Sequence, residues 1–163
     1  MLKSILSSAD CAACRFCCSF RRKSLWETPL FDTVTKEKLE KKFPKARFKK
    51  AGTESFTVSL EHLYKTDDSE EEATCPFLSE SGCVLSPDEK PFDCSIWPLR
   101  VCKKDGKFSV MLENTCPAIN RQPIQNVENL LNSGLGKKII SYAQKNQGIV
   151  KDYQSDFTIF DSF

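Results

Sequence analysis

The sequence has little histidine and no long apolar run, and both shortages limit what the protein can be. Its 163 residues include a single histidine, His62, so any metal would have to be held mainly by thiolates. No apolar run approaches the ~20 residues that a membrane-spanning helix needs. The short, weakly apolar stretch at residues 1–6 lacks the pattern of a secretory signal. We therefore expect a soluble, cytoplasmic protein with no membrane partner.

Neither sign of charge is in excess. The chain has 24 Lys and Arg residues against 22 Asp and Glu residues, a net charge of +2. A general polyanion binder normally has a strongly basic surface, so no nucleic-acid partner is indicated. The sequence also lacks the G-x-G-x-x-G, P-loop and G-x-S-x-G motifs, so standard nucleotide-binding and acyl-transfer sites are not indicated either.

Cysteine, in contrast, is abundant: there are nine. In a reducing compartment, closely spaced thiols more often bind metal than form disulfides. Four of them lie within the eight residues C-A-A-C-R-F-C-C: Cys11, Cys14, Cys17 and Cys18. If this stretch is one helix, all four thiols share a third of its surface. If it is turn-rich, the C-x-x-C step offers two thiolates to one ion.

The other cysteines are more dispersed: Cys75, Cys83, Cys94, Cys102 and Cys116. We expect a loop-rich segment to bring most of them back to the first group. Together they would complete two four-thiolate sites, or one iron–sulfur cluster and one zinc site. For Cys102 we expect a buried thiol, since free cysteine is often buried as a small apolar residue. Close thiolates repel one another unless cations offset their charge. Nearby candidates for that role are Arg15, Arg21, Arg22 and Lys23.

The order of these motifs resembles that of a known family. After C-A-A-C-R-F-C-C come C-P-F-L at 75–78, Cys83, K-P-F-D-C at 90–94, W-P at 97–98 and C-P-A at 116–118. This order resembles the YkgJ-like cysteine-cluster proteins with the CxxCxxCC signature, described as zinc- or iron-chelating domains, over roughly residues 11–118. Lys90 departs from the arginine usual there, and Ala118 from glycine. The resemblance implies eight metal ligands: Cys11, Cys14, Cys17, Cys18, Cys75, Cys83, Cys94 and Cys116.

The resemblance leaves the metal and its role open. It implies an iron–sulfur cluster, of the [4Fe–4S] type, or Zn²⁺, in a centre that serves redox chemistry or cofactor maturation. Alternatively, structural zinc stabilises the fold of an interaction module that binds an unknown protein partner. A third possibility is an enzyme, because a similar domain occurs in flagellin lysine N-methylases, where an iron–sulfur centre is implied; this chain is much shorter. His62 as a lone ligand or base is a minor alternative.

For the fold, we expect one α+β domain spanning 1–163, small, loop-rich and centred on metal. Residues 11–118 would be the cysteine-cluster metal-binding region, and 119–163 a C-terminal helical segment and tail. The pattern predicts a helix over Thr35–Phe43, capped by Thr35, and a strand over Glu54–Leu60 with one buried side. The basic stretch 33–50 is expected to pair with the acidic stretch 67–72.

Three further elements are expected near the C-terminus. Asp105-Gly106 predicts a hairpin that joins Leu99–Cys102 to Lys107–Leu112. Residues 124–145 read as helix, split by Gly134 and Gly136. The apolar tail at 157–163 is expected to pack on the domain, and the tryptophans Trp26 and Trp97 are expected in the core.

Overall fold

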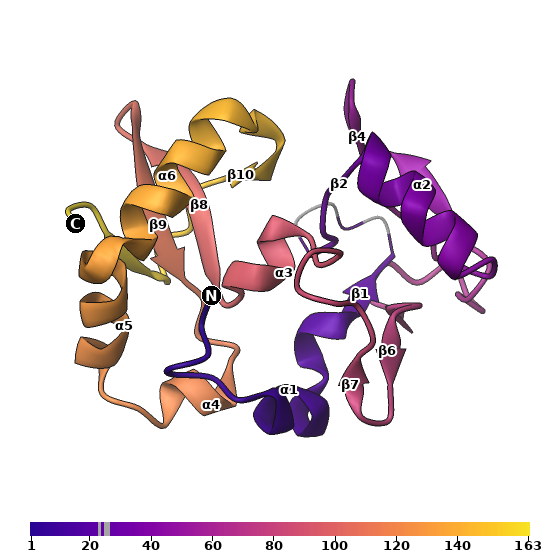
Figure 1. Cartoon of the computed structure of the whole chain (residues 1–163), viewed down its shortest axis with the longest axis horizontal. Coiled ribbons are helices and arrows are strands. Elements are labelled where there is room, and N and C mark those ends of the chain that lie inside the picture. Colours follow the sequence, from indigo (N-terminus) through magenta and orange to yellow (C-terminus); the bar gives the residue numbers. More distant parts are fainter. Residues whose placement is uncertain (23, 25–26) are drawn as a thin grey trace. The chain divides into compact units, whose positions relative to one another are not determined.

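The computed structural model describes residues 1–22, 24 and 27–163 (Figure 1). The chain falls into two compact units. The terminal unit comprises Met1–Asp10 and Ile96–Phe163, and the cysteine unit comprises Cys11–Ser95. Short helices and small, mostly antiparallel sheets confirm the α+β class. The single-domain boundaries stay a prediction, and the roles suggested for Lys23 and Trp26 lie outside the described residues.

The cysteine unit is built from short elements. They are α1 (Ser8–Cys14), which begins just before the unit, the 3-10 helix η1 (Phe16–Cys18), β1 (Ser19–Arg21), β2 (Phe31–Asp32), α2 (Thr33–Lys42), β3 (Phe48–Lys50), β4 (Ser55–Val58), β5 (Glu72–Thr74), β6 (Leu78–Ser79), β7 (Gly82–Cys83) and α3 (Phe92–Ile96). Strands β2, β4 and β3 form a three-stranded sheet, while β1–β5 and β6–β7 are antiparallel pairs.

Helix α2 begins two residues earlier than the sequence predicts. Its N-cap is Asp32, whose side chain accepts a hydrogen bond from the Thr35 backbone N–H at 2.7 Å. The prediction that Thr35 is the cap is therefore wrong. An aspartate with extended backbone satisfies a first-turn N–H, and so it can start the helix before Thr35.

Strand β4 is buried on both sides. Val58 and Leu60 are 1% and 3% exposed, as predicted, but Thr57 is 0% exposed as well. The prediction of a single buried side is wrong at Thr57, because protein covers that side of β4 as well as the side of Val58.

The core of the cysteine unit is aromatic. Its buried members are Phe20, Phe31, Leu39, Ala46, Val58, Leu60, Ala73 and Phe77. The Phe77 ring centroid lies 5.3 Å from that of Phe43, 6.0 Å from Phe31 and 6.2 Å from Phe48. Cys75 packs against the same cluster, so apolar burial fixes the position of one predicted ligand.

The expected pairing of basic and acidic stretches is wrong. From the acidic stretch, Glu70 and Glu71 pair with Arg21 and Arg22 at 3.0 and 3.5 Å. The basic stretch pairs elsewhere; for example, Lys42 holds the buried carboxylate of Glu89 at 2.9 Å. The reason is the pairing of β1 with β5, which brings Arg21 and Arg22 next to the acidic stretch 67–72.

The terminal unit centres on the predicted hairpin. Strand β8 (Leu99–Lys104) pairs with β9 (Lys107–Leu112), and the turn residues Asp105 and Gly106 have φ of 50° and 78°. Two positive φ values are what a two-residue hairpin turn requires. Two further strands complete the order β10-β8-β9-β11: β10 (Val150–Lys151) and β11 (Thr158–Phe160). The pairing of β11 confirms that the tail packs on the protein.

Helices complete this unit. They are α4 (Pro117–Asn120), α5 (Ile124–Leu130), the π-type turn η2 (Leu131–Leu135), α6 (Gly136–Lys145) and the 3-10 helix η3 (Gln147–Ile149). The predicted split is confirmed at Gly134, where φ is 113°. Gly136, in contrast, has helical backbone at the start of α6. In the part of the chain that the structure describes, no helix is both long and apolar enough to cross a bilayer.

The same unit buries an ion pair. Arg100, on β8, donates from Nε to Glu113 Oε1 at 3.0 Å, and both side chains are about 95% buried. The guanidinium carbon of Arg100 lies 4.3 Å from the centre of the Trp97 ring, a cation–π contact. Trp97 itself is half-buried. The peptide bond between Trp97 and Pro98 is cis.

Candidate metal centre

The CxxCxxCC segment is not one helix. Cys11 and Cys14 lie on α1, which ends at Cys14, and Arg15 has a left-handed backbone with φ of 57°. Cys17 and Cys18 lie on the separate 3-10 helix η1. The helical alternative, with all four thiols on one stripe, is therefore wrong. The chain turns at Arg15 and presents the cysteines as two pairs.

Backbone pairing joins the first cysteine group to the second. Strands β1 and β5 are antiparallel with Ser19 opposite Thr74, so Cys18 and Cys75 are the next opposite pair. The Cys75 N–H donates to the Cys18 carbonyl at 2.7 Å. Cys18 is the last residue of η1, and its own N–H donates to the Arg15 carbonyl at 3.0 Å. The contact is therefore a single backbone hydrogen bond at the end of the β1–β5 pair.

Thiol contacts extend this junction to four cysteines. The pKa of Cys17 is raised, first by a hydrogen bond with the Cys18 thiol and then by burial. Burial raises the pKa of Cys75 to about 12, and the nearby Cys83 and Cys17 thiols add to the shift. The Lys90 ammonium lowers the pKa of both Cys17 and Cys75. One cation therefore faces a group of thiols.

Helix α1 contacts the hairpin that carries Cys83. A Cβ built on Gly82, which has φ of 103°, would lie 3.4 Å from the Ala12 Cβ. The Arg15 guanidinium donates to the Glu80 carbonyl at 3.0 Å and back to the Ala12 carbonyl at 3.1 Å. Figure 1 shows α1 beside the β6–β7 hairpin. Cys11 and Cys14 are thus held near the hairpin, with Cys14 and Cys83 exposed.

The remaining predicted residues lie on other elements of the chain. Cys94 is half-buried on α3, which Asp93 anchors by accepting a hydrogen bond from the Leu30 N–H at 3.2 Å. Cys116 is buried in the terminal unit at the N-cap of α4. Cys102 is 0% exposed on β8, which confirms the expected buried thiol. His62 is exposed.

The arginines near the first motif are occupied by other groups. Arg21 pairs with Glu27 at 2.5 Å and with Glu70, and Arg22 stacks 4.5 Å from the Tyr64 ring. The cation that acts on the thiols is Lys90, which sequence reasoning treats only as a departure from the family's arginine. Its position in K-P-F-D-C, beside Cys94, is the signal that points to it.

Lys90 stands at the end of a fixed turn. Its N–H and that of Glu89 both donate to the Ser86 carbonyl at 3.0 Å, and Glu89 accepts from the Ser86 N–H at 3.1 Å. Lys42 holds the Glu89 carboxylate through both oxygens at 2.9 Å. The turn therefore keeps Lys90 in place without using its ammonium group.

All nine cysteines are among the described residues, and each has a reduced thiol. Within that described part, no group of three or more His, Cys, Asp or Glu side chains is placed so that it could hold a metal ion. The donors fit a thiolate centre in chemistry, because soft sulfur ligands suit zinc and iron–sulfur clusters. A metal would have to draw them together from these positions.

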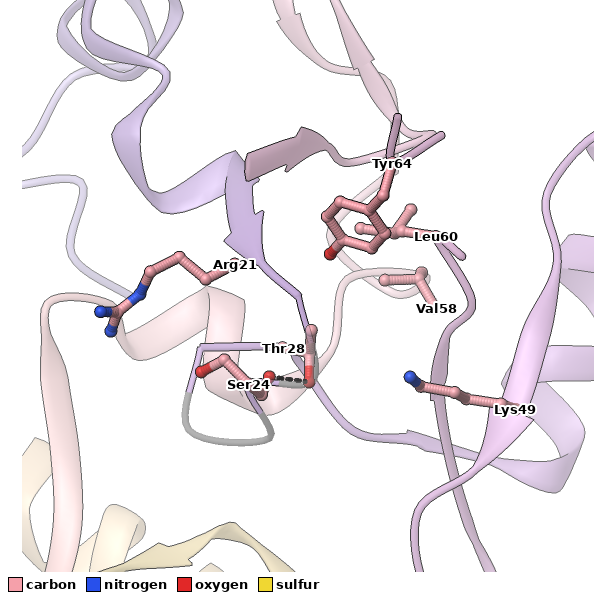
Figure 2. Close-up of a pocket in the computed structure, with 7 residues that line it drawn as sticks. All are labelled: Arg21, Ser24, Thr28, Lys49, Val58, Leu60 and Tyr64. Carbon is pink, nitrogen blue, oxygen red and sulfur yellow. Dashed lines mark hydrogen bonds between the residues drawn. The ribbon is translucent and has the colours of Figure 1, made fainter. Parts of the chain in front are cut away.

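Figure 2 shows a separate, small cavity in the cysteine unit, with a volume of about 10 Å³. Its apolar side is formed by Val58, Leu60 and Tyr64, and Thr28 donates from its hydroxyl to the Ser24 carbonyl at 3.1 Å. The cations on its lining, Arg21 and Lys49, are both paired with glutamates. The cavity contains no cysteine and is distinct from the thiol group.

Comparisons with protein-family models, curated proteins and solved structures find no match to this chain. The resemblance to the cysteine-cluster family therefore rests on the order and spacing of its motifs alone.

Proposed function

We propose that the protein binds an iron–sulfur cluster or zinc through cysteine thiolates, as the CxxCxxCC resemblance implies. The observation that carries the proposal is the hydrogen bond between the backbones of Cys18 and Cys75. It joins two cysteine groups that are far apart in the sequence. Cys17 and Cys83 interact with the same junction. These four cysteines are the proposed nucleus of the centre, and we call them the four-thiol group.

The adjacent pair Cys17 and Cys18 favours a cluster over a single ion. One tetrahedral zinc bound by neighbouring residues would strain the backbone between them, whereas a [4Fe–4S] cluster offers a separate iron to each thiolate. Cys11, Cys14, Cys94 and Cys116 complete the proposed ligand set. They would serve a second site, or exchange with members of the four-thiol group.

Charge compensation supports the same assignment. A four-thiolate zinc site, or a [4Fe–4S]²⁺ cluster with four thiolates, has a net charge of about −2. Lys90 already acts on Cys17 and Cys75, and its ammonium would offset part of that charge. Because such thiolates must stay reduced, we place the protein in the cytoplasm.

Anaerobic purification followed by metal analysis and a visible absorption spectrum tests the proposal. A brown protein that contains iron and sulfide supports a redox or cofactor-maturation role. A colourless protein that contains zinc supports an interaction module whose fold is stabilised by structural zinc. A folded protein that contains no metal would contradict the proposal.

A matched pair of variants tests the ligand assignment. We expect Cys75→Ala to lose most of the bound metal, because it removes a thiol from the four-thiol group. Cys102→Ala removes a thiol that is fully buried on β8 and should keep the metal. Both variants are checked for native secondary structure by circular dichroism. Equal metal loss in the two folded variants would refute the assignment.

A further inference from the structure

The pairing of β1 with β5 places two thiols where a disulfide can form. The register runs Phe20 opposite Ala73 and Ser19 opposite Thr74, and the next residues along the two chains are Cys18, which ends η1, and Cys75. Hydrogen-bonded residues of an antiparallel ladder have Cα atoms about 5.5 Å apart. Cys18 and Cys75 share one of the two bonds of such a pair, because the Cys18 N–H donates to the Arg15 carbonyl. Disulfides usually join Cα atoms about 4.4–6.8 Å apart. The Cys75 N–H to Cys18 carbonyl bond of 2.7 Å shows that the pairing extends to these residues.

We propose that Cys18 and Cys75 form a cross-strand disulfide when a peroxide oxidises the metal-free protein. One thiolate attacks the O–O bond of hydrogen peroxide, which gives a sulfenic acid and, after protonation of the leaving oxygen, water. The second thiol then attacks that sulfur, forms the S–S bond and expels a second water. The two sulfurs lose two electrons and the peroxide gains them. The sum is two thiols and one H₂O₂ to one disulfide and two waters.

Neighbouring thiols offer competing bonds, and geometry ranks them lower. A Cys17–Cys18 disulfide would close a strained ring through a single peptide bond, although the two thiols are hydrogen-bonded. Cys83 interacts with Cys75 but lies on β7, which pairs with β6 and not with the strand leading to Cys75. The Cys17 thiol also interacts with that of Cys75, but it is the backbone of Cys18 that is hydrogen-bonded to Cys75.

A consequence for regulation rests on the proposed function. A Cys18–Cys75 disulfide removes two thiolates from the four-thiol group, so oxidation would release the metal, and bound metal would protect the thiols. The disulfide itself does not depend on metal binding. The two statements can therefore fail separately.

Peptide mapping tests the disulfide. Metal-free, reduced protein receives one equivalent of hydrogen peroxide, and remaining thiols are blocked with N-ethylmaleimide. Trypsin with glutamyl endopeptidase then separates the peptide 16–21, which holds Cys17 and Cys18, from 73–80, which holds Cys75, and 81–89, which holds Cys83. We expect a linked 16–21/73–80 product and a fall of two thiols per chain.

Two variants assign the linked atom. Cys17→Ala should keep the 16–21/73–80 link, and Cys18→Ala should abolish it. The proposal is overturned if the link survives in Cys18→Ala, if 73–80 joins 81–89 instead, or if thiols are lost with no linked peptide. Circular dichroism of both variants shows that the comparison is made between folded proteins.

A zinc-loaded sample separates the two proposals. We expect zinc to slow formation of the link at least about tenfold, since bound thiolates are shielded. If the link forms equally fast with zinc present, the disulfide is upheld and the metal centre at these thiols is refuted. If no link forms in metal-free protein that takes up zinc normally, the disulfide is refuted and the metal centre is not affected.

Discussion

Replacing Phe77 tests whether the aromatic core positions the thiols. Phe77 is 1% exposed, and three aromatic rings surround it at 5.3–6.2 Å. Deleting a buried phenylalanine side chain costs about 3–5 kcal/mol through lost transfer energy and the cavity left behind. Part of that total is the loss of edge-to-face and tilted ring pairs. We therefore expect Phe77→Ala to lose about 4 kcal/mol and Phe77→Leu, which keeps most of the volume, about 1–2 kcal/mol.

The assay is urea unfolding of the metal-free, reduced protein, followed by circular dichroism. A total stability of about 5–15 kcal/mol leaves Phe77→Leu measurable even if Phe77→Ala is largely unfolded. The matched control is Phe16→Ala, because Phe16 is 49% exposed and its loss should change stability by at most about 0.5 kcal/mol. Equal losses for Phe77→Ala and Phe16→Ala would refute the reasoning.

The same substitution should change thiol chemistry. The Phe77 carbonyl accepts from the Val84 N–H at 2.9 Å, and the Leu78 N–H donates to the Cys75 carbonyl at 3.1 Å. Cys75 also packs against the cluster that contains the Phe77 ring. We expect Phe77→Leu to speed the reaction of Cys75 with a soluble disulfide reagent, and an unchanged rate would show that the core does not restrain it.

Three further substitutions test local features, each by the free energy of unfolding. Gly134→Ala should cost about 1–2 kcal/mol, because a backbone φ of 113° is strained for any residue with a side chain. No atom lies within 4 Å of the added Cβ, so the strain comes from the backbone alone, and an unchanged stability would contradict the backbone assignment. Asp32→Ala should cost about 0.5–2 kcal/mol by removing the α2 cap, and an unshifted midpoint would exclude that role. Backbone hydrogen bonds from Lys65 and Thr66 help lower the pKa of Glu71 to about 2. Its stabilisation is thus complete above about pH 4.5 and lost as the pH falls towards 2, so Glu71→Gln should be less stable only at the higher pH; a gap independent of pH would refute this.

Local chemistry accounts for what the sequence predicts correctly. The hairpin can be predicted because Asp105 and Gly106 readily adopt positive φ and lie between two segments of alternating apolar and polar residues. The helix break is readable because Gly134 adopts a conformation that other residues avoid. Burial of Cys102 is the usual state of a free cysteine, which behaves as a small apolar residue. In each case a few adjacent residues determine the outcome.

The errors arise where distant residues decide. A left-handed Arg15 divides the cysteine segment, and its side chain is held by the Glu80 carbonyl, which no local pattern reveals. Strands β1 and β5 have three residues each, too few for an alternating pattern, so their pairing and the Cys18–Cys75 contact could not be predicted. The abundance of thiols was readable from the sequence, but their neighbours were not.

The outer strands of the terminal sheet have a consequence for synthesis of the chain. Strand β10 pairs with β8 in parallel, and β11 pairs with β9 in antiparallel fashion, so both edges of the hairpin are covered by residues 150–160. A nascent chain that has made only the hairpin exposes two unpaired edges, which favour association with other chains. Residues 11–95, in contrast, form a unit that is complete before the hairpin is made. A pause that leaves the hairpin outside the ribosome before residues 150–160 have emerged would thus expose it to aggregation, and pairing of β10 and β11 would end that risk.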